Sequence, residues 1–404
     1  MSEVLEKYRE EAAQELDDIL KYWMKFTVDE TNGGFFGKID HSNTVYHEAP
    51  KGSVLNSRIL WTFSAAYNLK GNPGYLSMAK RACEYIRKYF IDEEFGGVYW
   101  TVDHQGKPLD TKKQIYALSF AVYGLSEFYK AGKDEKVKQA AIKLYRDIVE
   151  HSYDAEYGGY IEALSRDWKL MDDLRLSAKD ANEKKSMNTH LHVLEAFSNL
   201  YQVWPDEELK QRLIELVNIF LDHIISKKTD HLVLFFDEAW NERSKVISYG
   251  HDIEASWLLQ EAVEIIGNDD LKEKVKTRSV ELAKAAAKGV DEDGGLWYEF
   301  NVEQDHLIRE KHSWPQAEAM IGFFNAWQNT GSERFLKQSL KSWQFVQQYI
   351  HDKTCGEWYW GVKSDYTPMK HEDKVGIWKC PYHNSRACIE IVNRINQLPK
   401  EQSR

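Results

Sequence analysis

The stretch Gly96-Gly97-Val98-Tyr99-Trp100 is one of five similar stretches, and their recurrence along the chain decides the fold. Each combines turn-forming glycine with alternating aromatic or branched residues, a pattern that predicts a tight turn followed by a short strand. The other four are Gly33-Gly34-Phe35-Phe36, Gly158-Gly159-Tyr160-Ile161, Gly294-Gly295-Leu296-Trp297-Tyr298 and Gly356-Glu357-Trp358-Tyr359-Trp360.

The spacing between these stretches is nearly constant. It is 63 residues from Gly34 to Gly97, 62 from Gly97 to Gly159, and 61 between the last two stretches. The gap of 136 residues from Gly159 to Gly295 has room for two units, and the apolar run 231–236 near its middle marks a further unit without the glycine pair. Because self-similarity at a fixed period indicates repeated supersecondary units, the sequence predicts six of them.

The sequence between the turns has the apolar spacing of helices. One helix is predicted before each turn, at about 3–24, 74–90, 134–151, 207–226, 270–288 and 333–350. A second follows each turn, at about 53–69, 113–130, 187–202, 250–266, 313–329 and 382–397. Since each unit needs neighbours to bury its apolar faces, we expect an all-α (α/α)6 barrel of two concentric helix rings, as one domain over residues 1–404. An open solenoid is the alternative; closure is favoured because the second helices carry few charges, as an inner ring would.

Composition excludes several classes of function. The net charge of −11 argues against nucleic acid or an anionic membrane as a partner, and no apolar run approaches the ~20 residues of a membrane span. The four cysteines show no C-x-x-C spacing, which fits a reducing compartment. The charged, helical N-terminal stretch does not resemble a signal peptide. We therefore expect a soluble cytoplasmic protein, and a monomer.

Unusual polar and aromatic residues fall in the first turns of the second helices. If these helices run parallel in a ring, the residues meet at one mouth, as in a site for a small polar ligand. They are Arg58, Tyr116, Asn188, His192, His251, Trp314 and His383.

The stretch from Ser248 to Ala262 carries the strongest chemical signal. His251 and Glu254 are three residues apart on a predicted helix, and Trp257 follows at the same spacing. A histidine beside a carboxylate can act as an oriented proton-transfer group, although the same cluster could only cap a helix.

Each of the other candidates also has a purely structural interpretation. Arg58 could be a surface charge, His383 a helix cap, and Trp314 and Trp378 core residues. His190 and His192 point about 200° apart on a helix, so one of them at most faces the centre; we choose His192 and assign His190 to packing.

Cofactor motifs are missing from the sequence. There is no H-E-x-x-H, no cysteine ligand set, no G-x-x-x-x-G-K-[ST], no G-x-G-x-x-G and no G-x-S-x-G. We expect neither a metal nor another cofactor.

Four motifs together resemble the N-acylglucosamine 2-epimerase superfamily over essentially the full length, and within it the cellobiose 2-epimerases. They are S-x-N-x-H-L-H-V-L-E-A around His192, H-D-I-E-A-S-W-L-L at His251, W-P-Q-A-E-A at Trp314 and W-K-C-P-Y-H-N at His383. The resemblance implies an (α/α)6 barrel and metal-independent epimerisation at C2 of the reducing-end glucose of β-1,4-linked disaccharides. The polar stretch from Ser165 to Lys185 looks like the disaccharide-acting branch.

The same resemblance implies roles for individual residues. His251 and His383 would be the acid/base pair, Arg58 and His192 would stabilise the intermediate, and Glu254 would orient His251. The sugar site would be lined by Tyr116, Asp180, Asn188, Trp257, Trp314, Glu318 and Trp378. His190 and His312 depart from the family pattern and receive no role.

Other activities stay open at this level. Relatives acting on free mannose or N-acylglucosamine, or as aldose–ketose isomerases, share the fold and the histidines. A glycoside hydrolase could use Asp180, Glu254, Glu318 or Glu357 as its carboxyl pair, but it gives no role to the histidines and the arginine. A sugar-binding toroid without catalysis is the third class, since the aromatic residues alone would allow it.

Overall fold

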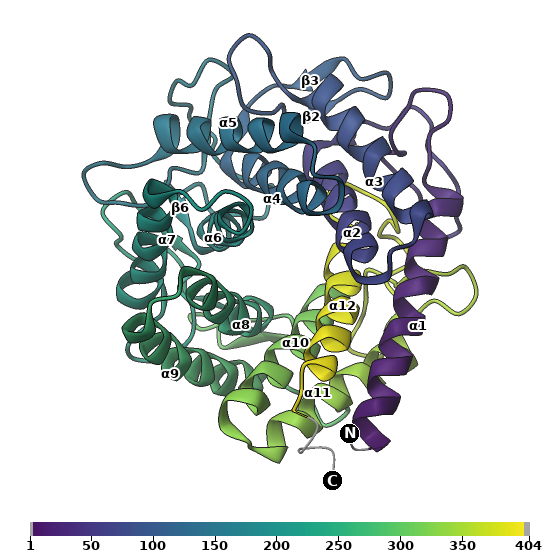
Figure 1. Cartoon of the computed structure of the whole chain (residues 1–404). Helices are drawn as coiled ribbons and strands as arrows, with labels where there is room; N and C mark the ends of the chain where they lie inside the picture. Colours follow the sequence, from purple (N-terminus) through teal and green to yellow (C-terminus); the bar gives the residue numbers. More distant parts are fainter. Residues whose placement is uncertain (1–2, 400–404) are drawn as a thin grey trace.

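The computed structural model describes residues 3–399, which form a closed double ring of helices (Figure 1). Even-numbered helices line the centre and odd-numbered helices surround them, and the last inner helix, α12, packs against α1, α2 and α10 to complete the circle. The predicted (α/α)6 barrel is confirmed, and the open solenoid is wrong.

The inner ring owes its position to helices that are apolar or small on nearly every side. In α2, for example, every residue from Ser53 to Ala66 is buried, as expected of a helix packed on all faces. The inner helices are α2 (Ser53–Lys70), α4 (Ile115–Gly132), α6 (Met187–Tyr201), α8 (Tyr249–Ile266), α10 (Ser313–Thr330) and α12 (Tyr382–Asn396).

The outer helices are amphipathic. In α5 the buried residues Val137, Ala141, Leu144, Tyr145 and Ile148 recur at helical spacing and face the inner ring, while the other side is polar. The outer helices are α1 (Glu3–Phe26), α3 (Pro73–Tyr85), α5 (Glu135–Ser152), α7 (Glu207–Ile219), α9 (Asp269–Ala286) and α11 (Glu333–Phe345). Short turns extend four of them: η1 (Ile86–Phe90), η2 (Phe220–Ile224), η3 (Ala287–Gly289) and η4 (Val346–Ile350).

Very short antiparallel strands tie each unit to the next. The residues just before an inner helix pair with the strand that follows the next unit's turn, and a bridge between Ile39 and Val375 joins the last unit to the first. The pairs are β1 (Lys51–Gly52) with β2 (Thr101–Val102), β4 (Lys113–Gln114) with β5 (Ala163–Leu164), β6 (Lys185–Ser186) with β7 (Phe235–Phe236), β8 (Val246–Ser248) with β9 (Glu299–Asn301), and β11 (Lys311–His312) with β12 (Gly361–Val362). Two further strands, β3 (Pro108–Asp110) and β10 (His306–Ile308), extend β2 and β9.

The glycine turns need a left-handed backbone at their first position. Gly96 has φ +81° and Gly294 has φ +90°, a region that glycine enters without steric penalty. In the fourth unit Asp230 takes the equivalent place with φ +62°, which aspartate tolerates better than most residues. The fourth unit thus keeps the turn without its glycine pair.

A Lys–Asp pair with a buried lysine fastens five of the six turns to the segment that leads into the inner helix. In the second unit, Lys113 Nζ lies 2.9 Å from Asp92 Oδ2, and both side chains are buried. The equivalent pairs are Lys51–Asp29, Lys185–Asp154, Lys311–Asp291 and Lys374–Asp352, at 2.6–2.8 Å. In the fourth unit His231 Nδ1 lies 2.6 Å from Asp252 Oδ2 instead. We call these the turn clasps.

The structure bears on two expectations, one about membrane-spanning segments and one about the cysteines. None of the helices among residues 3–399 is both long and apolar enough to cross a membrane. All four cysteines are free thiols, three of them buried.

Candidate active site

A cavity of about 560 Å³ opens where the N-terminal ends of the inner helices meet. Residues from all six inner helices reach it, as the parallel arrangement of the ring requires. Ten of the twelve predicted site residues line it: Arg58, Tyr116, Asp180, Asn188, His192, His251, Glu254, Trp314, Trp378 and His383.

The other two predicted residues, Trp257 and Glu318, lie behind the cavity wall. Both are buried, and the indole Nε1 of Trp257 donates to Glu318 Oε2 at 3.0 Å. Neither is among the residues that line the cavity. Glu318 acts on the cavity through His383, whose Nδ1 lies 2.7 Å from Glu318 Oε1.

His192 has the same kind of support. Its Nδ1 lies 2.9 Å from Glu195 Oε2, three residues further along α6. An ionised carboxylate can only accept a hydrogen bond, so Nδ1 of both His192 and His383 carries the proton and Nε2 offers a lone pair.

His251 is supported differently, and this corrects the predicted role of Glu254. The Nδ1 of His251 lies 2.8 Å from the hydroxyl Oγ of Ser248. Glu254 instead accepts from Arg386 Nη2 at 2.7 Å, and its Oε1 lies 3.9 Å from His383 Nδ1. Glu254 does not orient His251, because a buried guanidinium on another helix draws its carboxyl group away.

Arg386 on α12 joins the carboxyl groups behind the histidines. Its Nη2 donates to Glu254 and, at 2.6 Å, to Glu318, and its Nη1 contacts Glu195 and the Tyr382 hydroxyl. A charged fork of this kind suits several carboxylates at once. Arg386 thereby links the partners of His192 and His383.

Burial makes the three histidines neutral at neutral pH. It lowers the pKa of His251 to about 3, with a smaller contribution from His192 nearby. It also lowers the pKa of His383 well below its usual range, helped by Arg58 and Arg386, and that of His192 despite the opposing effect of Glu195. A buried imidazolium is disfavoured by desolvation, so each ring rests as a neutral base.

Two carboxyl groups that contact Arg386 differ in charge state. Burial, and then repulsion from Glu318, raises the pKa of Glu254. Although burial alone would raise it, the Arg386 guanidinium brings the pKa of Glu195 down to about 2. Glu195 is therefore a firm anion, whereas Glu254 readily holds a proton.

Arg58 is a buried cation without an anionic partner. Among residues 3–399 no carboxylate forms an ion pair with it; Nη2 donates to the Tyr116 hydroxyl at 2.7 Å, and Nη1 lies 3.8 Å from Cys380 Sγ. The guanidinium is 4.2 Å from the ring centre of Phe120 and 4.9 Å from that of Tyr382. Its positive charge is free to meet negative charge that develops in the cavity.

Two tryptophans form flat walls. The Trp314 ring lies 4.7 Å from the His251 ring and 5.6 Å from the His383 ring, so it packs between the two histidines. The Trp378 ring lies 5.9 Å from Tyr116 and 5.7 Å from Trp100. Indole faces suit the apolar C–H face of a sugar ring.

The rim is completed by the segment between β5 and β6. Asp180 on this segment lines the cavity and is held by the Ser177 backbone N–H and hydroxyl, at 2.8 and 2.9 Å. Glu299 faces the same cavity from β9, and burial, reinforced by Asp180, raises its pKa to about 7. The rim therefore carries carboxyl groups able to bind sugar hydroxyls.

One group of side chains has the composition of a metal site. Single ligand atoms of Glu254, Glu318 and His383 all lie within 4.8 Å of one another. However, both carboxyl groups are bonded to the Arg386 guanidinium, and His383 Nδ1 is bonded to Glu318. A cation there would have to displace a guanidinium, so the residues fit an arginine-centred ion cluster better than a metal centre.

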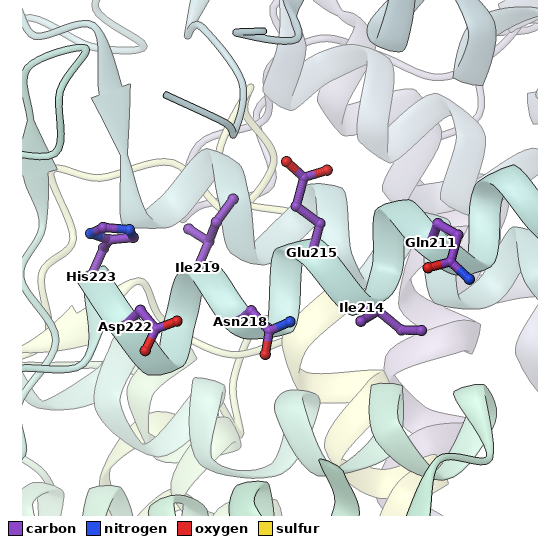
Figure 2. A pocket seen from close by; sticks show the side chains of 7 residues that line it. All are labelled: Gln211, Ile214, Glu215, Asn218, Ile219, Asp222 and His223. Carbon is purple, nitrogen blue, oxygen red and sulfur yellow. The ribbon is translucent and has the colours of Figure 1, made fainter. Parts of the chain in front are cut away.

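A second hollow, of about 360 Å³, lies on the outside of the ring (Figure 2). Its side chains all rise from α7 and η2, and none was predicted as a site residue. They are Gln211, Ile214, Glu215, Asn218, Ile219, Asp222 and His223. The convergence seen in the central cavity does not occur here.

The comparison with known proteins decides the family. Residues 34–387 match the N-acylglucosamine 2-epimerases. The chain belongs to this family. It is 47% identical to a cellobiose 2-epimerase of Bacteroides fragilis over 393 residues, covering 97% of this chain and 100% of the relative. A cellobiose 2-epimerase of Ruminococcus albus is 40% identical over 388 residues, covering 95% and 98%. The solved structure of cellobiose 2-epimerase from Bacillus thermoamylovorans superposes with a TM-score of 0.93 at 38% identity, covering 96% and 100%.

Three residues of this epimerase-family chain that support the histidines from behind the cavity lining were missed from the sequence. Glu195 stands three residues after His192 and Arg386 three after His383, the spacing that drew attention to Glu254, so a signal was present. Ser248 carried no such signal. His190 packs against the third turn, accepting from the Tyr160 backbone N–H at 2.9 Å, in line with its predicted packing role.

Proposed function

We propose that this protein is a cellobiose 2-epimerase, a cofactor-independent isomerase that interconverts glucose and mannose at the reducing end of β-1,4-linked disaccharides such as cellobiose and lactose. The observation that carries the proposal is the convergence of neutral His251 and His383 with the uncompensated Arg58 in one cavity. The names of the relatives described above support the substrate class.

The chemistry follows from the acidity of the sugar. A C–H bond at C2 can be broken under mild conditions only next to a carbonyl, so the pyranose must first open to the aldehyde. A neutral histidine then takes the C2 proton through Nε2, and the C–H electrons form the double bond of an enediolate. The negative charge moves to O1, where Arg58 can stabilise it with preorganised donors. Return of a proton to the opposite face of C2 gives the epimer.

The proposed roles rest on what stands behind each ring. His383 and His251 are the acid/base pair, one on each side of Trp314. The imidazolium that His383 forms on taking a proton is stabilised by Glu318, 2.7 Å away. His192, with Glu195 behind it, joins Arg58 in binding the developing oxyanion. Glu254 serves as part of the ion cluster around Arg386 rather than as a partner of His251.

The second sugar would occupy the rim. A cavity of about 560 Å³ is larger than one pyranose requires, and Trp378, Asp180 and Glu299 stand around its outer part. Tyr116 and Asn188 would bind the reducing-end unit deeper inside. We further propose that the protein works as a monomer in the cytoplasm, on the cysteine pattern and on the self-contained site.

Incubation with cellobiose in D₂O tests the proposal. The expected product, followed by NMR, is the glucosyl-mannose epimer with deuterium at C2, because the histidine N–H exchanges with solvent before the proton returns. Release of free glucose would instead indicate a glycoside hydrolase, and a ketose as the main product an isomerase. Binding without any new isomer would indicate a sugar-binding protein, and turnover of mannose or N-acylglucosamine alone a different branch of the family.

Replacing Trp378 by alanine is expected to raise KM by about tenfold while kcat changes little. The indole packs on the sugar in both ground and transition state, and loss of such uniform binding appears in KM. Steady-state kinetics on cellobiose measure both constants, with Trp297→Ala, outside the cavity lining, as a control. A loss confined to kcat would contradict the binding role.

A further inference from the structure

Ser248 stands at the N-cap of α8, but its hydroxyl does not cap the helix. It is the N-cap residue of α8, where serine normally accepts a hydrogen bond from a backbone N–H of the first turn. Ser248 makes no such bond. The equivalent Ser186, before α6, does: its hydroxyl accepts from the Thr189 N–H at 3.0 Å. The hydroxyl of Ser248 has been diverted to His251 Nδ1, at 2.8 Å.

This diversion sets His251 apart from the other two histidines. His192 and His383 have carboxylates behind Nδ1, at 2.9 and 2.7 Å, whereas His251 has a neutral hydroxyl. A carboxylate stabilises the imidazolium form by charge, but a hydroxyl provides only a hydrogen bond.

The charged surroundings of His251 do not replace the missing carboxylate. The groups that act on it from other helices are His192 of α6 and Glu318 of α10, and Trp314 covers one face of the ring. On its own helix, Glu254 is bonded to Arg386. Among residues 3–399 no carboxylate forms an ion pair with His251, so Ser248 is the group that decides how the ring is held.

We propose that Ser248 is a positioning residue for proton transfer, whose hydroxyl aims Nε2 of His251 into the cavity without placing a negative charge behind that ring. A ring with a hydroxyl behind it binds a proton less tightly than the same ring with a carboxylate there, so it returns the proton more readily in a reversible epimerisation. The inference rests on the proposed epimerase function and adds a residue that its chemistry requires.

Three variants of Ser248 and one control variant test it. Ser248→Ala is expected to lower kcat for cellobiose about tenfold or more, part of the 10²–10⁴ that a positioned acid–base group contributes, with KM within about twofold. Ser248→Thr keeps the hydroxyl and should restore kcat to within a few-fold of the wild type. Ser186→Ala is the matched control: it removes a true helix cap, so it should lower Tm and leave kcat unchanged. A Ser248→Ala enzyme with wild-type kcat, or a Ser248→Thr enzyme as slow as Ser248→Ala, would overturn the proposal.

The third variant, Ser248→Asp, addresses basicity directly. A carboxylate behind His251 raises its affinity for protons, so the acid limb of the kcat/KM profile should move to higher pH by about one unit or more. The ring itself can be followed without substrate by NMR titration of ¹⁵N-labelled histidine, assigned with His251→Gln. A folded Ser248→Asp protein with unchanged ring titration and unchanged acid limb would refute the tuning role; if it does not fold, the alanine and threonine variants decide.

Epimerisation by the wild type and the behaviour of the Ser248 variants test the proposed function and the role of Ser248 separately. A wild-type protein that does not epimerise cellobiose refutes the proposed function, whereas the histidine titration still reports whether Ser248 governs His251. A wild-type protein that is active, with Ser248 variants that match it in kcat and pH profile, refutes only the role of Ser248.

Discussion

Replacing His383 by alanine is expected to lower kcat for epimerisation by about 10²–10⁴, the range that a positioned general acid–base group supplies. The ring is 15% exposed, lines the cavity, and has Glu318 behind Nδ1, so its Nε2 is the best-supported base in the site. Because burial lowers its pKa well below the usual range, the ring is already unprotonated at neutral pH. We therefore expect wild-type kcat/KM to fall only in acid well below pH 6.5, where the ring takes up a proton.

The measurement is initial epimerisation rate on saturating cellobiose, with Tm as a check on folding. His383→Gln keeps much of the shape and hydrogen bonding of the ring but cannot relay a proton, so it should be as slow as the alanine variant. His223→Ala, on the outer helix face of Figure 2, is the control and should be fully active. If His383→Ala kept more than about a tenth of the wild-type rate, His383 would not be a proton-transfer group.

Replacing Arg58 by methionine is expected to move activity and stability in opposite directions. Activity should fall by about 10²–10³, since loss of one preorganised oxyanion donor costs about 2.7–4 kcal/mol. Stability should stay level or rise, because the variant removes a buried charge that has no carboxylate partner and replaces it with an apolar chain of similar length. The cavity in this view keeps an unpaired cation because the reaction intermediate supplies its counter-charge.

Kinetics and thermal unfolding on the same preparation check both halves. Tyr116→Phe removes only the hydroxyl that accepts from Arg58, so it should have a much smaller effect on kcat. Exchange of the C2 proton with D₂O should slow in parallel with epimerisation in Arg58→Met, because both pass through the enediolate. An unimpaired rate of exchange in this variant would argue against an oxyanion intermediate at Arg58.

The double ring of helices could be predicted from the sequence because the turn motif that marks each unit recurs along the chain. Six copies of one spacing leave few arrangements that bury every helix, and the predicted helix 53–69 differs from α2 (Ser53–Lys70) by one residue. The helix predicted at 113–130 begins instead at Ile115, because Lys113 and Gln114 pair with β5. The short strands after the turns were predicted from their aromatic pattern, whereas the two-residue strand before this helix is too short to form one.

Within the site, the sequence predicts contacts only between residues of the same helix. Helical spacing places His192 beside Glu195, and they do bond at 2.9 Å. The same spacing places His251 beside Glu254, yet there the bond is absent, because Arg386 approaches from α12 and binds Glu254 more strongly. Sequence spacing names possible neighbours; competition between helices far apart in the chain decides which of them bond.

The turn clasps have a consequence for how this architecture can change. Their residues do not line the cavity, and five of the six clasps, such as Lys113–Asp92, use residues that precede the inner helix, whereas the fourth uses Asp252 in the first turn of α8. The positions just beyond, where the chain carries Arg58, Tyr116, His251 and His383, take no part in them. In five of the units, a residue at the start of the inner helix can therefore be exchanged without loosening the junction. Because these positions surround one cavity, a single scaffold can acquire a different reaction by substitution of a few residues.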